Sequence, residues 1–248
     1  MSATISHLSG LVRKLGSRHR LGEEDVVAIL ALPYTRRTVD AAAYIVREGE
    51  PPRKSCSFVL SGYAFRQKLT VQGARQIVSI HMAGDLLDLQ HLFLRKSDHN
   101  VQSLTRMELA EVDRDALRAL ALERPAIGEA LWVDALIDAS IFREWVMNVG
   151  RRDARARIAH LICEFASRMD AAGLAGDGRY ELPMTQEQIG DATGLTSVHV
   201  NRTLKSLAAD GLVYRDRRYL TFADWERIRA VGDFSALYLH LDQIDPAS

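Results

Sequence analysis

The chain has 248 residues, and its 32 Lys+Arg residues balance 32 Asp+Glu residues, so its formal net charge is zero. This balance argues against a uniformly basic protein that coats nucleic acid and against an acidic disordered tail. The two cysteines, Cys56 and Cys163, are far apart and lack the Cys/His spacing of a zinc or iron–sulfur site, so we expect reduced thiols and no metal or other cofactor. We expect a cytoplasmic protein, because residues 1–20 have no apolar signal segment and no stretch approaches the roughly 18 apolar residues of a membrane span.

The first half of the chain has the pattern of a helix followed by short strands. Three acids precede the apolar residues of 23–32, which predicts a short helix that ends at Pro33. From about residue 38 to residue 112, runs rich in Val, Ile, Phe and Tyr alternate with glycines spaced 11 to 13 residues apart, which is typical of antiparallel strands joined by tight turns. We predict strands at 57–60, 63–71, 75–81, 101–104 and 108–112, in an all-β sandwich or roll.

Residues 125–149 have the composition of a long helix with no internal proline. Apolar residues are spread around this helix rather than along one stripe, so we expect burial on two sides. One side can pack on the β domain and the other can meet a second subunit; the alternative is a core helix of a larger monomer. Gly150 interrupts the pattern and is the predicted hinge, and a second helix follows at 154–171.

Residues 184–207, MTQEQIGDATGLTSVHVNRTLKSL, have the pattern of a helix-turn-helix. Thr185 and Gln188 form a capping box that begins the first helix, Gly194 supplies the turn, and Thr196 caps the second helix. At 100° per residue, one face of the second helix carries apolar side chains that must face the core, namely Val200, Leu204 and Leu207.

The opposite face of that second helix carries Val198, Arg202 and Lys205, flanked by Asn201 and Ser206. A guanidinium binds guanine O6 and N7, an amide binds an adenine edge, an apolar group contacts a thymine methyl, and a lysine binds phosphate. The simpler interpretation is a solvated helix face with two ordinary cations. The capped helix and glycine turn that precede it favour a DNA-recognition helix.

Residues 212–222 have the pattern of a β-hairpin with a charged turn. Arg215, Arg217 and Arg218 lie at its predicted tip, where they can contact the DNA backbone as a wing. A charged hairpin tip that is merely solvated is the alternative.

This helix-turn-helix closely resembles that of the Crp/Fnr family of bacterial transcription regulators. Weaker resemblances run through the chain in the family's order: VREGE, LSGYA, GARQI, MAGDLL and GRRDARARIAHLICEF. The resemblance implies an α+β fold with an antiparallel β-roll (jelly roll), a long dimerisation helix and a winged helix-turn-helix. The implied boundaries are 1–124 for a cyclic-nucleotide-binding-like sensory domain, 125–150 for the dimerisation helix, 151–224 for the DNA-binding domain, and 225–248 for a C-terminal helix and tail.

The resemblance also assigns roles to residues. The family's base-reading positions fall on Ser197, Val198, Asn201 and Arg202, and Val198 departs from the glutamate common there. The family's positions that contact phosphate or lie beside the groove fall on Thr185, Gln186, Thr196 and His199. With Lys205, Arg217 and Arg218, these residues form the expected interface with double-stranded DNA. The implied partners are a second copy of the chain and RNA polymerase, with no membrane.

The effector side departs from the family's cyclic-AMP-binding members. After Gly84-Asp85 the chain has Leu86, Leu87, Asp88 and Leu89, and His99-Asn100 stands where those members resemble one another in an Arg-Ser pair. An anionic phosphate needs cationic or N–H donors, so we expect an effector other than cyclic AMP, or none; a cyclic-nucleotide-responsive regulator is the alternative. His81, His91 and His99 lack the spacing of metal or haem ligands and are expected to be structural.

Two other classes of function are alternatives to a DNA-binding regulator. A cupin-type β-barrel enzyme needs a close H-x-H pair with a downstream Glu and another His, and this chain has neither an H-x-H pair nor a carboxylate at the matching distance from His81; a P-loop and a G-x-G-x-x-G loop are absent too. A protein-interaction module built on the long helix, without DNA binding, is the third possibility. We therefore expect a regulator that is not an enzyme and that binds a pseudo-palindromic operator as a homodimer.

Overall fold

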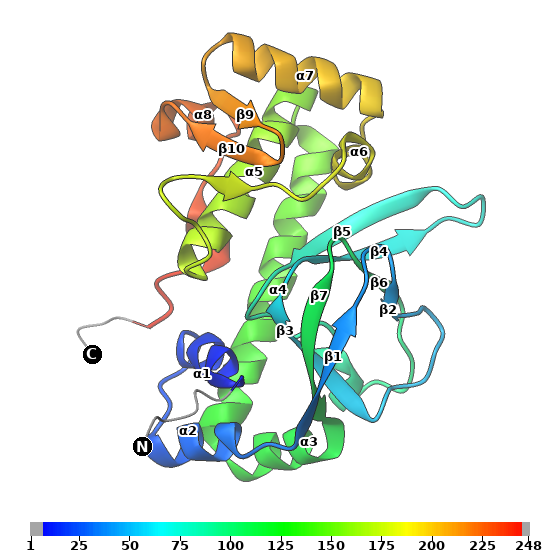
Figure 1. The fold of residues 1–248 in the computed structure, drawn as a ribbon, viewed down its shortest axis with the longest axis vertical. Coiled ribbons are helices and arrows are strands. Elements are labelled where there is room, and N and C mark those ends of the chain that lie inside the picture. Colours follow the sequence, from blue (N-terminus) through cyan, green and yellow to red (C-terminus); the bar gives the residue numbers. More distant parts are fainter. Residues whose placement is uncertain (1–6, 245–248) are drawn as a thin grey trace. The chain divides into compact units, whose positions relative to one another are not determined.

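The computed structural model describes residues 7–244, so the ends of the expected first and last segments, residues 1–6 and 245–248, lie outside the described residues. The chain divides into two compact units (Figure 1). The first unit contains the described residues up to Gln67, Ile80–Ala139 and the described residues from Asp242, and the second contains Lys68–Ser79 and Ser140–Leu241. Each unit is described by itself below.

Residues 9–123 form two antiparallel sheets and several short helices, and the part of the second sheet at 75–79 belongs to the second unit. One sheet has the strand order β1-β7-β3 and the other the order β2-β6-β4-β5. The elements in chain order are α1 (Ser9–Gly16), α2 (Glu23–Leu30), β1 (Tyr34–Val39), β2 (Tyr44–Val46), β3 (Ser55–Ser61), β4 (Ala64–Leu69), β5 (Arg75–His81), the 3₁₀ helix η1 (Leu89–Leu92), β6 (Asn100–Ser103), β7 (Met107–Asp113) and α3 (Arg114–Glu123).

Strand β3 explains how the two cores of this unit form. Phe58 pairs with Ala110 and Val59 with Leu109 in the register with β7. Because successive side chains point to opposite faces of a strand, Phe58 enters a core that includes helix residues such as Leu11 and Leu131, whereas Val59 enters the core between the sheets. A strand buried on both faces has a nearly continuous apolar sequence, as the segment around Phe58 does.

The predicted strands are confirmed, with small shifts at their ends. The predicted turns are confirmed too, because Gly49, Gly62, Gly73 and Gly84 all have positive φ angles. Gly62 is the tightest, since a Cβ there would lie 2.5 Å from the Arg106 carbonyl oxygen. The sequence reading missed α1, α3, β1 and β2. Helices α1 and α3 have only 8 and 10 residues, so each offers few apolar positions from which to detect a helical period, and β1 has four consecutive polar residues at 35–38 where a half-buried strand would alternate.

The long helix α4 runs from Pro125 to Arg151. The predicted interruption at 150–153 is present at Arg152 and Asp153, and the predicted second helix, α5 (Ala154–Ala171), is confirmed. The position of the hinge at Gly150 is wrong, because α4 passes through Gly150 and α5 begins after Asp153, whose carboxylate accepts the Ala156 N–H. A single glycine costs a helix only about 1 kcal/mol relative to alanine, whereas an N-cap aspartate defines a helix start. The first turns of α4 pack Ile127 and Leu131 into the core of the first unit.

The far side of α4 carries a row of exposed apolar side chains. These are Trp132, Leu136, Phe142, Val146 and Met147. Burial on one side and exposure on the other account for the wide apolar distribution in the sequence. No helix in the described part of the chain is long and apolar enough to span a membrane.

The second unit continues from α4 into a helical domain with a small sheet of order β8-β10-β9. Helix α5 is followed by β8 (Tyr180–Glu181), α6 (Gln186–Thr193), α7 (Ser197–Ala209), β9 (Val213–Asp216), β10 (Tyr219–Phe222), α8 (Trp225–Val231) and the 3₁₀ helix η2 (Ala236–Leu239). The predicted helix-turn-helix and hairpin are confirmed.

Candidate nucleic-acid interface

Local interactions set the geometry of the α6–α7 pair. Thr185 Oγ1 accepts the Gln188 N–H, and the Gln188 side chain accepts the Thr185 N–H, so the predicted capping box is present. Gly194 ends α6 in the left-handed conformation with φ 68°, and the Thr196 hydroxyl accepts the His199 N–H at the start of α7. These three signals are local in sequence, and each stabilises one end of a helix.

The inner face of α7 differs in one position from the prediction. Val200 and Leu207 are buried as expected, but Leu204 is only half-buried and Thr203 is buried instead. On a helical wheel, Thr203 and Leu204 lie on opposite sides of Val200. The buried face of α7 is centred toward the Thr203 side, so it runs through Val200, Thr203 and Leu207 at spacings of three and four.

The outer face of α7 presents three different chemistries. Val198 is 77% exposed, and Ser197, Arg202 and Lys205 are exposed as well. Within the described part of the chain, no hydrogen bond or ion pair holds the Arg202 guanidinium. Asn201 is half-buried and donates one Nδ2–H to Gln186 Oε1 at 3.0 Å, which ties α7 to the first turn of α6. Among residues 7–244, no other hydrogen bond engages its second N–H or its side-chain carbonyl oxygen.

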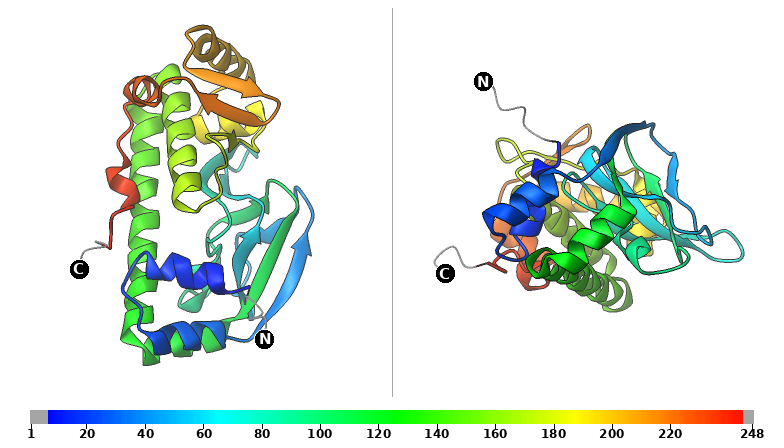
Figure 2. Two further views of the ribbon diagram at one scale, coloured as in Figure 1. Left: turned by 60° about the vertical axis from the view of Figure 1, so that its left-hand side comes forward. Right: turned by 90° about the horizontal axis from the view of Figure 1, so that it is seen from below.

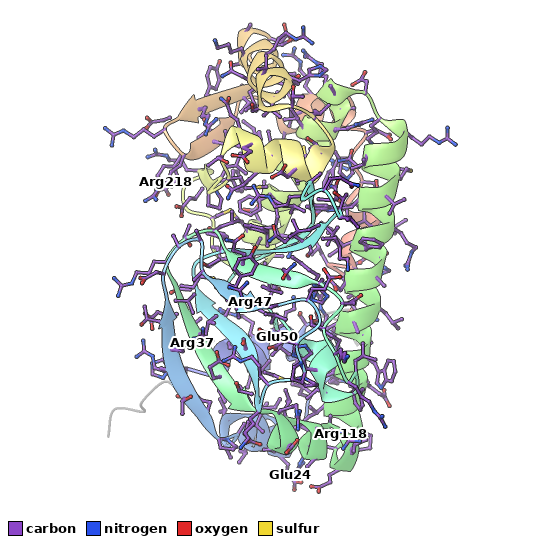
Figure 3. The ribbon with its side chains drawn as sticks, turned by 90° about the vertical axis from the view of Figure 1, so that its right-hand side faces the viewer. Glu24, Arg37, Arg47, Glu50, Arg118 and Arg218 are labelled. Carbon is purple, nitrogen blue, oxygen red and sulfur yellow. The ribbon has the colours of Figure 1, made fainter. Side chains whose placement is uncertain are left out.

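The remaining predicted residues lie at helix starts and on the hairpin. Thr185 and Thr196 are exposed N-caps, and His199 is half-buried in the first turn of α7. Arg217 and Arg218 are exposed at the β9–β10 turn (Arg218 is labelled in Figure 3). Arg218 forms an ion pair with Glu181 at 3.2 Å, and the Arg217 carbonyl accepts a hydrogen bond from Arg215, so part of this charged turn is occupied by its own contacts.

Sequence reasoning missed three residues that position α7. Gly190 has no room for a side chain, because a Cβ there would lie 2.4 Å from the Leu195 carbonyl oxygen. Arg155 on α5 donates to the Ser206 hydroxyl at 2.8 Å and pairs with Asp210 at 2.6 Å. Arg157 donates to the Thr193 carbonyl at 3.1 Å. Gly190 could have been recognised from the sequence, because a glycine inside a helical pattern often indicates close packing. The arginine contacts could not, because they join residues 36 or more positions apart in the chain.

In the segment after Gly84-Asp85, the acid Asp88 is bound by groups of the protein itself. Asp88 is fully buried, and its carboxylate accepts the Ser57 N–H at 2.8 Å. The sequence has no arginine close to Asp88, yet the fold brings Arg53 near it. Arg53 forms an ion pair with Glu111 at 3.3 Å. Glu111 also forms an ion pair with Arg37 at 3.1 Å (Arg37 is labelled in Figure 3). Burial raises the pKa of Asp88 to about 7.

His81, His91 and His99, the three histidines expected to be structural, are buried. His91 Nδ1 lies 3.9 Å from Asp88 Oδ2, beyond hydrogen-bond distance, and burial lowers the pKa of His91. His99 contacts Asp98 at 2.7 Å and Gln90 at 3.2 Å. His81 Nδ1 lies 3.8 Å from Asp85. Over residues 7–244, no group of three or more His, Cys, Asp or Glu side chains is arranged to hold a metal ion, and both cysteines are free and buried.

Comparison with known proteins decides the family. Residues 36–124 match the cyclic nucleotide-binding domain family, and residues 156–231 match the Crp-like helix-turn-helix domain family. The chain belongs to the Crp/Fnr family. It is 26% identical to the transcriptional activator protein FnrL of Cereibacter sphaeroides over 239 residues, covering 94% of this chain and 95% of FnrL.

Other relatives and solved structures agree with this placement. A probable transcriptional activator of Rhizobium leguminosarum is 28% identical over 181 residues, which cover 72% of each chain. The structure of FixK2 from Bradyrhizobium japonicum superposes with a TM-score of 0.75 at 25% identity, covering 83% of this chain and all of that one. This Crp/Fnr protein is thus a transcriptional regulator with the α+β fold of its family, and the expectation of that fold is confirmed.

Proposed function

We propose that this regulator binds a pseudo-palindromic DNA site as a homodimer, with α7 in the major groove, and that it performs no catalysis. The observation that carries the proposal is the outer face of α7, where exposed Val198 and Arg202 stand on a helix whose two ends and inner face are held by the domain. Rigid elements place base-reading groups more accurately than mobile loops do.

Each group on this face matches a feature of a base edge. Arg202 is suited to guanine O6 and N7, and Val198 to the methyl group of thymine. Asn201 keeps one N–H and its carbonyl oxygen for an adenine edge while Gln186 holds its other N–H. Ser197 completes the base-reading set at the start of α7. Lys205, Thr185, Thr196, His199, Arg217 and Arg218 serve phosphate contacts or line the groove.

The exposed apolar row of α4 supports the dimer. Large apolar patches on a soluble protein mark interaction surfaces, and two copies of one helix bury the same row against each other around a twofold axis. A dimer places two recognition helices about 34 Å apart, one helical turn of DNA. RNA polymerase is a further proposed partner, on the strength of the family alone.

The region that replaces the family's phosphate cassette supports an effector other than cyclic AMP, or none. Asp88 is an acid, its N–H partner belongs to Ser57, and the nearby Arg53 is held by Glu111. A phosphate placed here would meet a carboxylate and no uncommitted donor from these three residues.

Selection of bound duplexes from a random DNA pool tests the proposal. The parent is expected to enrich an inverted repeat with half-site centres about 10 bp apart. Leu136→Asp on the exposed row of α4 should abolish enrichment of the repeat, because a charge at the dimer interface separates the subunits. Leu122→Asp is the matched control, since Leu122 on α3 is 65% exposed and Leu136 is 63% exposed. Enrichment of no sequence by the parent would overturn the proposal.

A further inference from the structure

The ten residues that follow α8, here called the C-terminal strap (residues 232–241), lie beyond both matched family domains, which end at 124 and 231. The strap is drawn in red in Figure 2, left, and its residues contact α5 at His160 and Glu164. It buries Phe234 and Leu239 and contains η2. Asp233 and His240 near its two ends have positive φ angles of 45° and 47°, an unfavourable conformation for residues other than glycine that only surrounding contacts maintain.

The strap is held on α5 by backbone and ring contacts. The Gly232 carbonyl accepts a hydrogen bond from His160 Nδ1 at 3.1 Å, and a Cβ on Gly232 would lie 2.8 Å from the His160 backbone nitrogen, so the strap begins directly against the α5 backbone. The Tyr238 ring stacks on the His160 ring with centroids 5.7 Å apart, and Phe234 meets the same imidazole edge-on. Burial and the Arg152 charge lower the pKa of His160 to about 4, so it is neutral at pH 7.

The strap is also held by charge at the connection between α4 and α5. Arg152, whose side chain is almost fully buried, donates to the Asp233 carbonyl at 2.9 Å and pairs with the Asp233 carboxylate at 3.1 Å. The same guanidinium pairs at 2.8 Å with Glu144, about two helical turns earlier on α4. The Asp233 carboxylate is 78% exposed, and its removal would leave the buried guanidinium paired with Glu144.

One buried carboxylate joins all three elements. Glu164 on α5 accepts the Tyr238 hydroxyl of the strap at 2.8 Å and the Trp145 indole N–H of α4 at 2.9 Å. Burial and the Glu164 charge raise the pKa of Tyr238, so the phenol keeps its proton. That proton lies between two acceptors, because His160 Nε2 is 3.0 Å from the same hydroxyl oxygen.

We infer that the strap is a positioning element that fixes the angle between α4 and α5. The two helices are joined only through Arg152 and Asp153, and hydrogen bonds close to that junction restrain the angle weakly. The Trp145–Glu164–Tyr238 junction lies eight residues before Asp153 on α4 and eleven after it on α5. At about 1.5 Å per residue, these are lever arms of roughly 12 and 16 Å. This inference rests on the proposed function, because the α4–α5 angle sets the distance between two recognition helices only in a DNA-binding dimer.

Tyr238→Phe in the full chain tests the inference, because it keeps the ring and removes the hydroxyl. DNA probes carry the selected half-sites at the preferred spacing and at spacings one base pair shorter and longer, and a fourth probe carries a single half-site. The parent's preference for its own spacing should fall by about fivefold, the factor that one net hydrogen bond of about 1 kcal/mol supplies. Affinity for the single half-site should be unchanged, which a merely destabilising change would not give. Leu237→Ala is the control, because Leu237 lies in the same turn and is 80% exposed.

A second readout does not depend on DNA. Amide hydrogen exchange should become faster in the last two turns of α4 and the first two turns of α5 in Tyr238→Phe and in Asp233→Asn, and not in Leu237→Ala. If the parent binds no DNA, the proposed function fails while the exchange experiment still reports whether the strap holds the two helices. Exchange in Tyr238→Phe that equals exchange in the parent would overturn the inference. If the parent binds DNA, faster exchange in Tyr238→Phe together with the parent's spacing preference would overturn it as well.

Discussion

The outer face of α7 and the interior of the β-roll around Asp88 use similar side chains in opposite ways. On α7, Val198 and Arg202 project from a helix whose ends are capped, and the guanidinium is not committed within the described residues. Around Asp88, the charged groups are engaged within the protein. Glu111 forms ion pairs with Arg53 and Arg37, and the Asp88 carboxylate accepts a hydrogen bond from the Ser57 N–H. A surface that keeps its donors available can read a ligand, whereas an interior that consumes them stabilises a fold.

The largest expected effect comes from Arg202→Ala, which removes the uncommitted guanidinium. We expect the loss of roughly 1–3 kcal/mol at each half-site, hence twice that on a full operator, with relaxed preference at one base pair. Fluorescence anisotropy with operator variants measures it. Arg217→Ala on the hairpin is the comparison, because a phosphate contact should weaken binding to all sequences alike and reduce the salt dependence. Equal losses on every sequence for Arg202→Ala would place base reading elsewhere.

An intermediate effect is expected in the β-roll from Asp88→Asn, which keeps an acceptor for the Ser57 N–H. Burial raises the folded-state pKa of Asp88 above its unfolded value, so its stabilising effect is present at low pH and is lost as the pH rises through about 7. Between pH 5 and pH 8 the parent should lose about 2 kcal/mol of unfolding free energy relative to the variant. Urea denaturation at both pH values measures this difference, and parallel pH profiles would show that Asp88 is ionised throughout.

The smallest expected effect comes from the proposed contact between Val198 and the methyl group of a thymine. Replacing thymine by uracil at the contacted position should weaken parent binding by about fourfold per half-site, because one buried methyl group contributes about 0.8 kcal/mol. Val198→Ala should bind the thymine and uracil probes equally. If the parent shows no difference between the two probes at any thymine of the half-site, Val198 does not contact a thymine methyl and the α7 face reads DNA without it.

The helix-turn-helix was predictable because its signals are local. The Thr185–Gln188 box, the left-handed Gly194 and the Thr196 cap each act within four residues, so the sequence carries them openly. The strands followed from glycine spacing for the same reason. The hinge was misplaced by two residues because a helical glycine was given more weight than the Asp153 cap.

Other features were hidden because they depend on contacts far apart in the chain. The Arg155 contacts that hold α7 and the Tyr238–Glu164 bond of the strap span 51 and 74 residues. The wide apolar distribution of α4 was visible as composition, but the structure buries only one side of the helix, and the sequence could not show which apolar residues stay exposed.

By itself, the amino-acid sequence determined the β-roll, the long helix, the winged helix-turn-helix and the residues on the outer face of α7, because short-range periodicity and caps specify each of these. Only the tertiary structure decided that Arg53 near Asp88 is held by Glu111, that Thr203 rather than Leu204 faces the domain, and that a C-terminal strap holds α4 to α5. Buried charges and hydroxyls take whichever partner the fold brings within about 3 Å, and that choice is made by packing rather than by neighbours in the sequence.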